Sequence, residues 1–283
     1  MNYTVYEEET LKKLQDMERK ILKYFAGICE ENNIDYYVYG GSLLGVIRHK
    51  GFIPWDDDID VAMFRDDYER FVEAFNKKKS EKFYLVSPES EDSYFLYFPK
   101  LMMKETKFRE WWADQVDFES GIFIDIFILD GLPKNKLHQK LHILRSRFLV
   151  RLLSISQLKF RGYPMFTQIV VNILHRIFKV FRITNEKLKK KTFKVFKKYN
   201  AKDTKQCFCA STVVYPPIFE KAQHWPARRA KFDGIDVSIP NKAEEILTII
   251  YGDYMKMPPE SERFNHMTSE IDFGPYDKKE INR

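Results

Sequence analysis

Cysteine and long apolar runs are both scarce in this chain. Only three of its 283 residues are cysteine (Cys29, Cys207 and Cys209), an odd, sparse set that argues against a disulfide framework and suits a reducing compartment. No run of eighteen apolar residues occurs, so no ordinary transmembrane helix is expected, and the Glu- and Lys-rich residues 1–20 do not resemble a signal peptide. We therefore expect a cytoplasmic protein.

Acidic residues are nearly missing from residues 131–200. This stretch holds eighteen Lys or Arg and one acidic residue, Glu186, which gives it a net charge of +17. The whole chain carries +6, so the remaining residues carry −11. Two interpretations stay open for residues 134–200: amphipathic helices lying on the anionic inner face of a membrane, or a basic exterior on helices that pack normally. Nucleic acid is not the expected partner, because the segment has no recognised binding motif.

Aromatic and aliphatic residues are plentiful, at 44% hydrophobic including 16% aromatic, which is enough for a large core. Periodicity and turn residues predict alternating strands and helices in the first half and helices in the basic stretch, broken near 162–164 and near Thr184. The expected fold class is α/β (α+β), with a mixed sheet core and an inserted basic helical region. The predicted helices are 6–32, 43–49, 66–79 and 242–251, and the predicted strands are 35–39, 58–63, 82–87, 95–103, 121–128 and a β-like stretch at 230–239.

Four carboxylates fall within five residues at Asp56, Asp57, Asp58 and Asp60. Like charges this close repel one another, and a divalent cation is the commonest reason for gathering them. Side chains two apart share one face of a strand, so Asp58 and Asp60 are expected to point together. A solvated acidic turn or an accidental calcium-binding loop is the alternative.

Asp125 interrupts the apolar stretch Gly121–Ile128. A lone carboxylate there is costly to bury unless it is paired or bound to a metal. We expect Asp125 either to complete the metal cluster or to accept the proton of an attacking hydroxyl. A bond to a loop backbone or to an arginine is the alternative.

The Gly40-Gly41-Ser42 turn lies upstream of the carboxylates, and glycine lets a phosphate approach the backbone closely. We expect Gly40, Gly41 and Ser42 to contact a substrate phosphate and Ser42 also to cap the short helix that follows, with an ordinary strand-to-helix turn as the alternative. Several basic residues are further candidates for contacts with substrate phosphates, namely Arg48, His49, Lys100, Arg263 and His266. Lys100 has an alternative role as a charge that protects an edge strand from pairing.

Together these motifs resemble the LicD/fukutin family. The resemblance rests on Tyr36-x-Val-Tyr-Gly-Gly-Ser-Leu-Leu-Gly-x-x-Arg-His49, on Gly51-Phe-Ile-Pro-Trp-Asp-Asp-Asp-Ile-Asp60 and on Phe123-Ile-Asp-Ile-Phe127 with Asp130-Gly131. It returns in Val237-Ser-Ile-Pro240 and in Tyr251-Gly-Asp-Tyr-Met255-x-x-Pro-Pro259. The basic region has no matching motif, so we expect a catalytic core at 1–133 and about 215–283 with an insertion at 134–214.

The resemblance implies a nucleotidyltransferase fold related to polymerase β. It also implies a Mg²⁺-dependent (or Mn²⁺-dependent) transferase that moves a substituted phosphate, such as phosphocholine, from a CDP-linked donor, CDP-choline first, to a glycan hydroxyl. The acceptor would be a teichoic acid, a capsule or a lipopolysaccharide, met on a lipid carrier at the membrane. Asp58, Asp60 and Asp125 fall on the family's metal carboxylates.

Two other functions stay open. A nucleotidylyltransferase would use the same carboxylates but attach the nucleotide itself to a small molecule. A non-catalytic membrane-associated scaffold would keep the fold without the activity.

Overall fold

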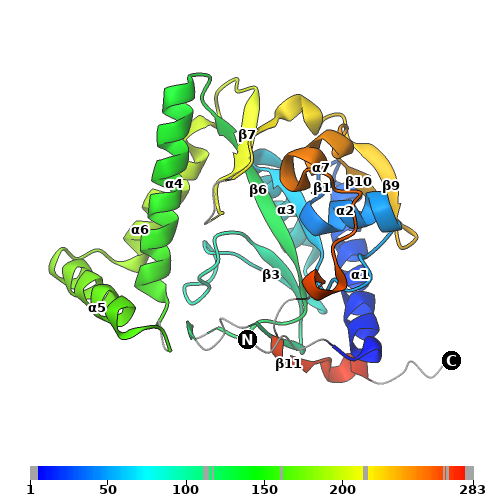
Figure 1. Ribbon diagram of the computed structural model, residues 1–283, viewed down its shortest axis with the longest axis horizontal. Helices are drawn as coiled ribbons and strands as arrows, with labels where there is room; N and C mark the ends of the chain where they lie inside the picture. The colour runs from blue at the N-terminus through cyan, green and yellow to red at the C-terminus, as the bar shows by residue number, and fades with distance from the viewer. Residues whose placement is uncertain are drawn as a thin grey trace.

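A mixed sheet lies at the centre of the protein and helices surround it (Figure 1). This computed structural model describes residues 6–110, 115–116, 118–159, 162–212, 216–263, 265 and 268–277. The expected α/β class is confirmed at this level.

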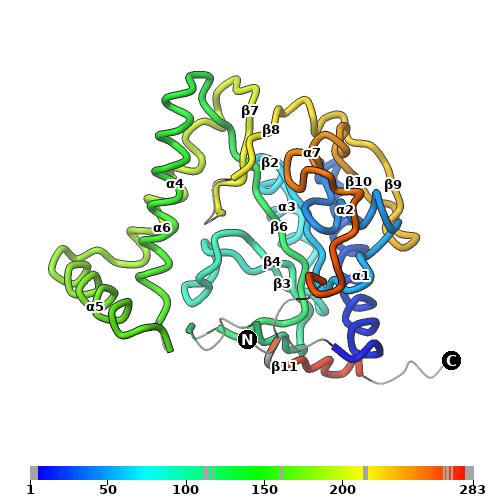
Figure 2. The backbone as a smooth tube through the Cα atoms, viewed as in Figure 1, coloured from blue at the N-terminus to red at the C-terminus, as the bar shows by residue number. Residues whose placement is uncertain are grey.

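The strands of the main sheet follow the order β1-β2-β6-β4-β3, and β7 pairs with β6 and β8 with β7 (Figure 2). Among the described pairings, β2 and β6 are parallel and the others are antiparallel. Two further pairs, β9–β10 and β5–β11, form small separate sheets. The bounds are β1 Tyr37–Val38, β2 Asp60–Phe64, β3 Phe83–Val86, β4 Lys100–Met103, β5 Lys107–Glu110, β6 Phe123–Leu132, β7 Gln206–Cys209, β8 Phe219–Glu220, β9 Arg228–Phe232, β10 Ile235–Ile239 and β11 Thr268–Asp272.

The helices are amphipathic, and most bury one apolar face. That of α1 includes Leu14, Ile21 and Phe25, which belong to the same core as the central strands. The helices predicted from periodicity are confirmed, and so are the breaks in the basic segment. The bounds are α1 Glu8–Glu31, α2 Gly40–His49, α3 Arg65–Lys78, α4 Lys136–Gln157, α5 Met165–Val180, α6 Asn185–Phe196 and α7 Ala243–Tyr251.

Several strand predictions need correction. The strand predicted at 95–103 begins only at Lys100, because Pro99 has no N–H to give to a ladder. Strand β7 lies within the predicted helical insertion at 134–214, yet it pairs with β6. The stretch at 230–239 forms a hairpin around Asp233-Gly234, whose positive φ angles of 46° and 85° suit a two-residue turn. The hairpin stays outside the main sheet, but Phe232 and Val237 enter its core.

The basic region forms a layer of its own beside the sheet. Helices α4 and α6 pack on each other and on β6 and β7 through a second apolar cluster that includes Leu132, Val150 and Phe196. Figure 1 shows α5 beyond them, on the side away from the sheet. Within the described residues, no helix has both the length and the apolar character needed to cross a bilayer.

His224 is fully buried among aromatic rings, an unusual place for a group that titrates. Its ring meets those of Tyr37, Phe64 and Phe219 edge-on, at centroid distances of 5.2, 5.5 and 5.6 Å. Burial lowers the pKa of His224 from its usual 6.5 to about 4.

This burial predicts a loss of stability in acid. Between pH 6.5 and 4 the unfolded chain binds a proton at His224 and the folded chain does not, so stability falls as the pH drops, by up to about 3 kcal/mol for this residue. His224→Phe keeps the aromatic packing and should reduce the dependence of stability on pH between 6.5 and 4. Urea unfolding at pH 7, 5.5 and 4.5 measures it.

His138→Phe is the matched control, because His138 is exposed on α4. That variant should follow the wild-type pH dependence. Equal slopes for His224→Phe and wild type would contradict the assignment.

Candidate metal and phosphate site

Three adjacent strands bring Asp60, Asp125 and Lys100 side by side. In the parallel pair, Asp60 of β2 is the register partner of Asp125 of β6. In the antiparallel pair on the other edge of β6, Lys100 of β4 is also the partner of Asp125. Register partners project from the same face of a sheet, so the three side chains form one row across it.

Asp58 joins this row from the loop before β2. One carboxylate oxygen from each of Asp58, Asp60 and Asp125 lies within 4.8 Å of the other two. Asp125 is buried, and Asp58 and Asp60 are half-buried. The structure therefore brings together the three residues that the sequence singled out as a cluster. Strand β2 begins at Asp60 rather than at the predicted Asp58.

The Gly40-Gly41 turn closes over the carboxylates and begins α2. Gly40 has a φ of +53°, and a Cβ placed on it would lie 2.6 Å from Asp60 Oδ2. A Cβ on Gly41 would lie 3.1 Å from Asp56 Oδ2. Glycine is favoured at residue 40, because the positive φ strains other residues and a Cβ would push against the Asp60 carboxylate. The first turn of α2, whose N–H groups face no earlier helical carbonyl, thus begins beside the acidic cluster.

Ser42 does not cap α2, because the helix already begins at Gly40. Its side chain is buried, and its Oγ accepts a hydrogen bond from the Asp60 N–H at 2.8 Å. A hydroxyl in this position holds the backbone of a carboxylate residue in place, which differs from the predicted direct contact with substrate.

Lys100 is buried and ion-paired, and this corrects both of its predicted roles. Strand β4 is paired on both sides, so Lys100 protects no edge. Its Nζ lies 3.0 Å from Asp125 Oδ1 and 3.2 Å from Glu110 Oε2. Only 1% of its side chain is exposed, which leaves no room for a phosphate beside it.

The pKa of Asp125 reflects two opposing effects. Burial raises this pKa, the Lys100 ammonium lowers it, and the Glu110 and Asp58 carboxylates raise it, so that together they move it from 3.8 to about 7. The row therefore places a carboxyl that titrates near neutral pH beside two other carboxylates.

Helix α1 and Tyr6, which precedes it, contact the acidic loop, which the sequence did not reveal. Gln15 Nε2 donates to the Asp56 carbonyl oxygen at 2.8 Å, and the Tyr6 hydroxyl donates to Asp57 Oδ2 at 2.8 Å. Glu18 is fully buried nearby; burial and then Asp58 raise its pKa well above the usual range. The available signal was a glutamate on the apolar face of a helix, between Leu14 and Ile21.

Basic and aromatic side chains gather beside the same loop. Arg48 Nη1 donates to the Tyr254 carbonyl oxygen at 2.9 Å, and its Nε donates to His49 Nε2 at 2.9 Å. The His49 ring meets the Trp55 ring edge-on, and the Arg263 guanidinium lies 4.9 Å from the centroid of that same ring. Arg48, His49 and Arg263 thus converge around Trp55, the residue before the acidic run. His266, also predicted to bind substrate, lies outside the described residues.

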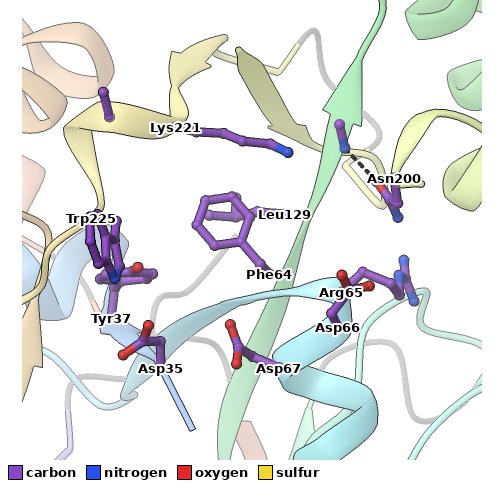
Figure 3. A pocket seen from close by; sticks show the side chains of 12 residues that line it. Asp35, Tyr37, Phe64, Arg65, Asp66, Asp67, Leu129, Asn200, Lys221 and Trp225 are labelled. Carbon is purple, nitrogen blue, oxygen red and sulfur yellow. Dashed lines mark hydrogen bonds between the residues drawn. The ribbon is translucent and has the colours of Figure 1, made fainter. Parts of the chain in front are cut away.

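A separate cavity of about 450 Å³ opens at the other end of the β2–β6 pair (Figure 3). Tyr37, Phe64, Leu129 and Lys221 are among its lining residues, and none of the sequence-predicted site residues that the structure describes lines it.

Arg65 and Asp130 stiffen the structure next to this cavity. The Arg65 guanidinium donates to both carboxylate oxygens of Asp130 at 3.0 and 2.7 Å, and Asn200 donates to Oδ1 at 2.6 Å. Strand β6 therefore carries one carboxylate satisfied by arginine and another, Asp125, in the acidic cluster.

The buried Lys100 is expected to be essential for stability. Lys100→Met leaves Asp125 and Glu110 without their cation, and breaking a buried pair from one side costs about 3–5 kcal/mol. Adding Asp125→Asn should recover part of that loss, because it removes the stranded charge. Urea unfolding of the two single variants and the double variant measures the coupling.

Lys104→Met is the control, since Lys104 follows β4 and its Nζ donates only to the Ser80 carbonyl oxygen among described contacts. It should cost far less than Lys100→Met. Similar losses from the two variants would mean that the ion pair is not the cause.

Comparison with known proteins places the chain in a family. A sequence profile described as LicD/FKTN/FKRP, nucleotidyltransferase domain, matches residues 33–150. The chain is 33% identical over 270 residues to the lipopolysaccharide cholinephosphotransferase LicD of Haemophilus influenzae, which covers 92% of this chain and 97% of that protein. It is 41% identical over 49 residues to the ribitol 5-phosphate transferase FKRP of mouse and of human, which covers 17% of this chain and 10% of FKRP. The chain belongs to the LicD/FKTN/FKRP family.

Proposed function

We propose that this protein transfers a substituted phosphate from a CDP-linked donor to a hydroxyl of a cell-surface glycan. CDP-choline is the first donor to test, because the relative that aligns over most of the chain is a lipopolysaccharide cholinephosphotransferase. FKRP, named for ribitol 5-phosphate, makes an alditol phosphate the next candidate. The observation that carries the proposal is the convergence of Asp58, Asp60 and Asp125 beside the Gly40-Gly41 turn.

The donor set fits a hard divalent cation such as Mg²⁺ or Mn²⁺. Three carboxylates with oxygens within 4.8 Å repel one another when ionised, and a dication converts that repulsion into coordination. Asp58, Asp60 and Asp125 would hold the ion, which would neutralise charge on the donor diphosphate. Further oxygen ligands would come from the substrate and from water.

The chain's own groups would position the donor. The N–H groups at the start of α2 are suited to hold a phosphate oxygen, and Gly40 lets the donor come close to the backbone. Arg263 lies beside Trp55 and Arg48 is hydrogen-bonded to His49, and both would offset the negative charge of the departing CMP. Catalysis of this kind depends mainly on positioning and electrostatics.

Asp125 would act on the acceptor hydroxyl. A carboxylate beside the bound phosphate can accept a proton from a hydroxyl brought to it, and Lys100 fixes its orientation. Attack of the acceptor oxygen on the distal phosphorus forms the new P–O bond and breaks the bond to CMP. Lys100 is thus a positioning residue.

Binding of the metal can be tested without activity. Mg²⁺ at 100 times its dissociation constant should stabilise the wild type by about 2.7 kcal/mol. Asp58→Asn should lose most of this gain, because it removes one anionic ligand of the cluster. Thermal unfolding with and without Mg²⁺ measures the difference.

Asp66→Asn is the matched control, because Asp66 lies at the start of α3 and outside the cluster. It should respond to Mg²⁺ as the wild type does. An unchanged Mg²⁺ response in Asp58→Asn would refute the metal assignment.

The transfer reaction is tested with a panel of CDP-linked donors and a glycan acceptor. We expect CMP release that needs Mg²⁺ or Mn²⁺ and falls at least 100-fold in Asp60→Asn, while Asp66→Asn retains it. Label in the donor's nucleotide should leave as free CMP. Label on the acceptor as CMP would instead favour a nucleotidylyltransferase, and no metal-dependent donor binding at all would favour a scaffold.

A further inference from the structure

Helix α5 leaves an apolar face uncovered. Phe166, Ile169, Val170, Ile173, Ile177 and Val180 recur at the spacing of a single helical stripe, and all are exposed. The exposure is large, at 73% for Met165, 77% for Phe166 and 75% for Val180. Large apolar side chains that cluster in this way mark an interaction surface.

The rest of α5 explains how the helix is held. Val171 and Phe178 are its buried residues, and His175 Nε2 lies 2.6 Å from the Ile155 carbonyl oxygen of α4. One narrow side therefore attaches α5 to α4, while the opposite side faces outward, away from the sheet (Figure 1). Helices α4 and α6 are anchored more broadly, because both bury residues in the second apolar cluster, although α4 also exposes Leu137, Leu141 and Phe148.

The charge around α5 identifies the kind of partner. Neither α4 nor α5 contains an acidic residue, whereas Arg176, Lys179 and Arg182 are exposed on or just after α5. A second copy of this chain would bring two such positive surfaces together, which is unfavourable. A bilayer with anionic headgroups matches both the apolar stripe and the positive charge. Its acyl boundary can bury the apolar side chains, and its phosphates can bind the Lys and Arg side chains.

We propose that α5 docks the protein onto an anionic lipid bilayer, lying in the plane of the interface with its exposed apolar face inserted. A 16-residue helix spans about 24 Å and is suited to lie on the surface rather than to cross it. The sequence alone suggested membrane contact for all of residues 134–200, and this proposal assigns it to one helix. It concerns a surface other than the carboxylate site and is independent of the proposed function.

Vesicle flotation of the full chain tests the proposal. The protein should float with vesicles of phosphatidylcholine and phosphatidylglycerol and much less with phosphatidylcholine alone. Ile169→Glu/Ile173→Glu should lower the bound fraction at least about tenfold, because it places charge in the inserted face. Arg176→Ala/Lys179→Ala should weaken binding to the anionic vesicles and reduce its dependence on salt.

Ile249→Glu is the control, because Ile249 is an exposed isoleucine on α7. It should float like the wild type, and all variants should show the same thermal response to Mg²⁺ as the wild type. A wild type that stays off anionic vesicles at low salt overturns the proposal. Normal flotation of Ile169→Glu/Ile173→Glu also overturns it. So does a wild-type protein that forms an α5-dependent dimer instead of binding vesicles.

Discussion

The parallel pairing of β2 with β6 is the constraint on which the site depends. Its register sets Asp60 opposite Asp125, and the antiparallel neighbour β4 sets Lys100 on the other side of Asp125. Because side chains alternate along a strand, a slip of one residue would turn one of these groups to the other face of the sheet and dissolve the row. The long apolar run of β6 makes such a slip costly, since Ile124, Ile126 and Ile128 would leave the core.

The fold gathers negative charge and then limits its cost in three different ways. Lys100 neutralises part of the negative charge of Asp125 through an ion pair, and the Tyr6 hydroxyl donates a hydrogen bond to the Asp57 carboxylate. Glu18 is buried where its raised pKa favours the neutral acid. None of these devices removes the repulsion among Asp58, Asp60 and Asp125, whose oxygens remain within 4.8 Å of one another. Negative charge is therefore concentrated beside the Gly40-Gly41 turn, where a cation and a phosphate would meet.

Local sequence patterns predicted the helices and strands better than they predicted which strands and side chains pair with one another. The periodicity of α1 and the alternation around Asp58 and Asp60 depend on neighbours in sequence, so the helices and the carboxylate cluster were found. The pairing of Lys100 with Asp125 depends on a strand register between segments 25 residues apart, which periodicity does not encode. Short strands such as β7 were missed because four residues, one of them polar, give little alternation to detect. Glu18 was hidden for a related reason: its burial depends on a loop that folds against α1 from elsewhere in the chain.

The uneven distribution of charge along the chain corresponds to two different regions of the fold. Acidic residues are concentrated in the part that forms the sheet and the carboxylate site, and residues 131–200 carry +17 in the helical layer beside it. If the basic charge served only to solubilise packed helices, the apolar residues of α5 would be covered; instead a whole stripe of them is exposed. Charge of one sign around an uncovered apolar stripe is poorly suited to self-association and well suited to an anionic interface. The charge and exposed apolar residues of the basic layer are thus better explained by the proposed contact with an anionic bilayer than by packing in the core.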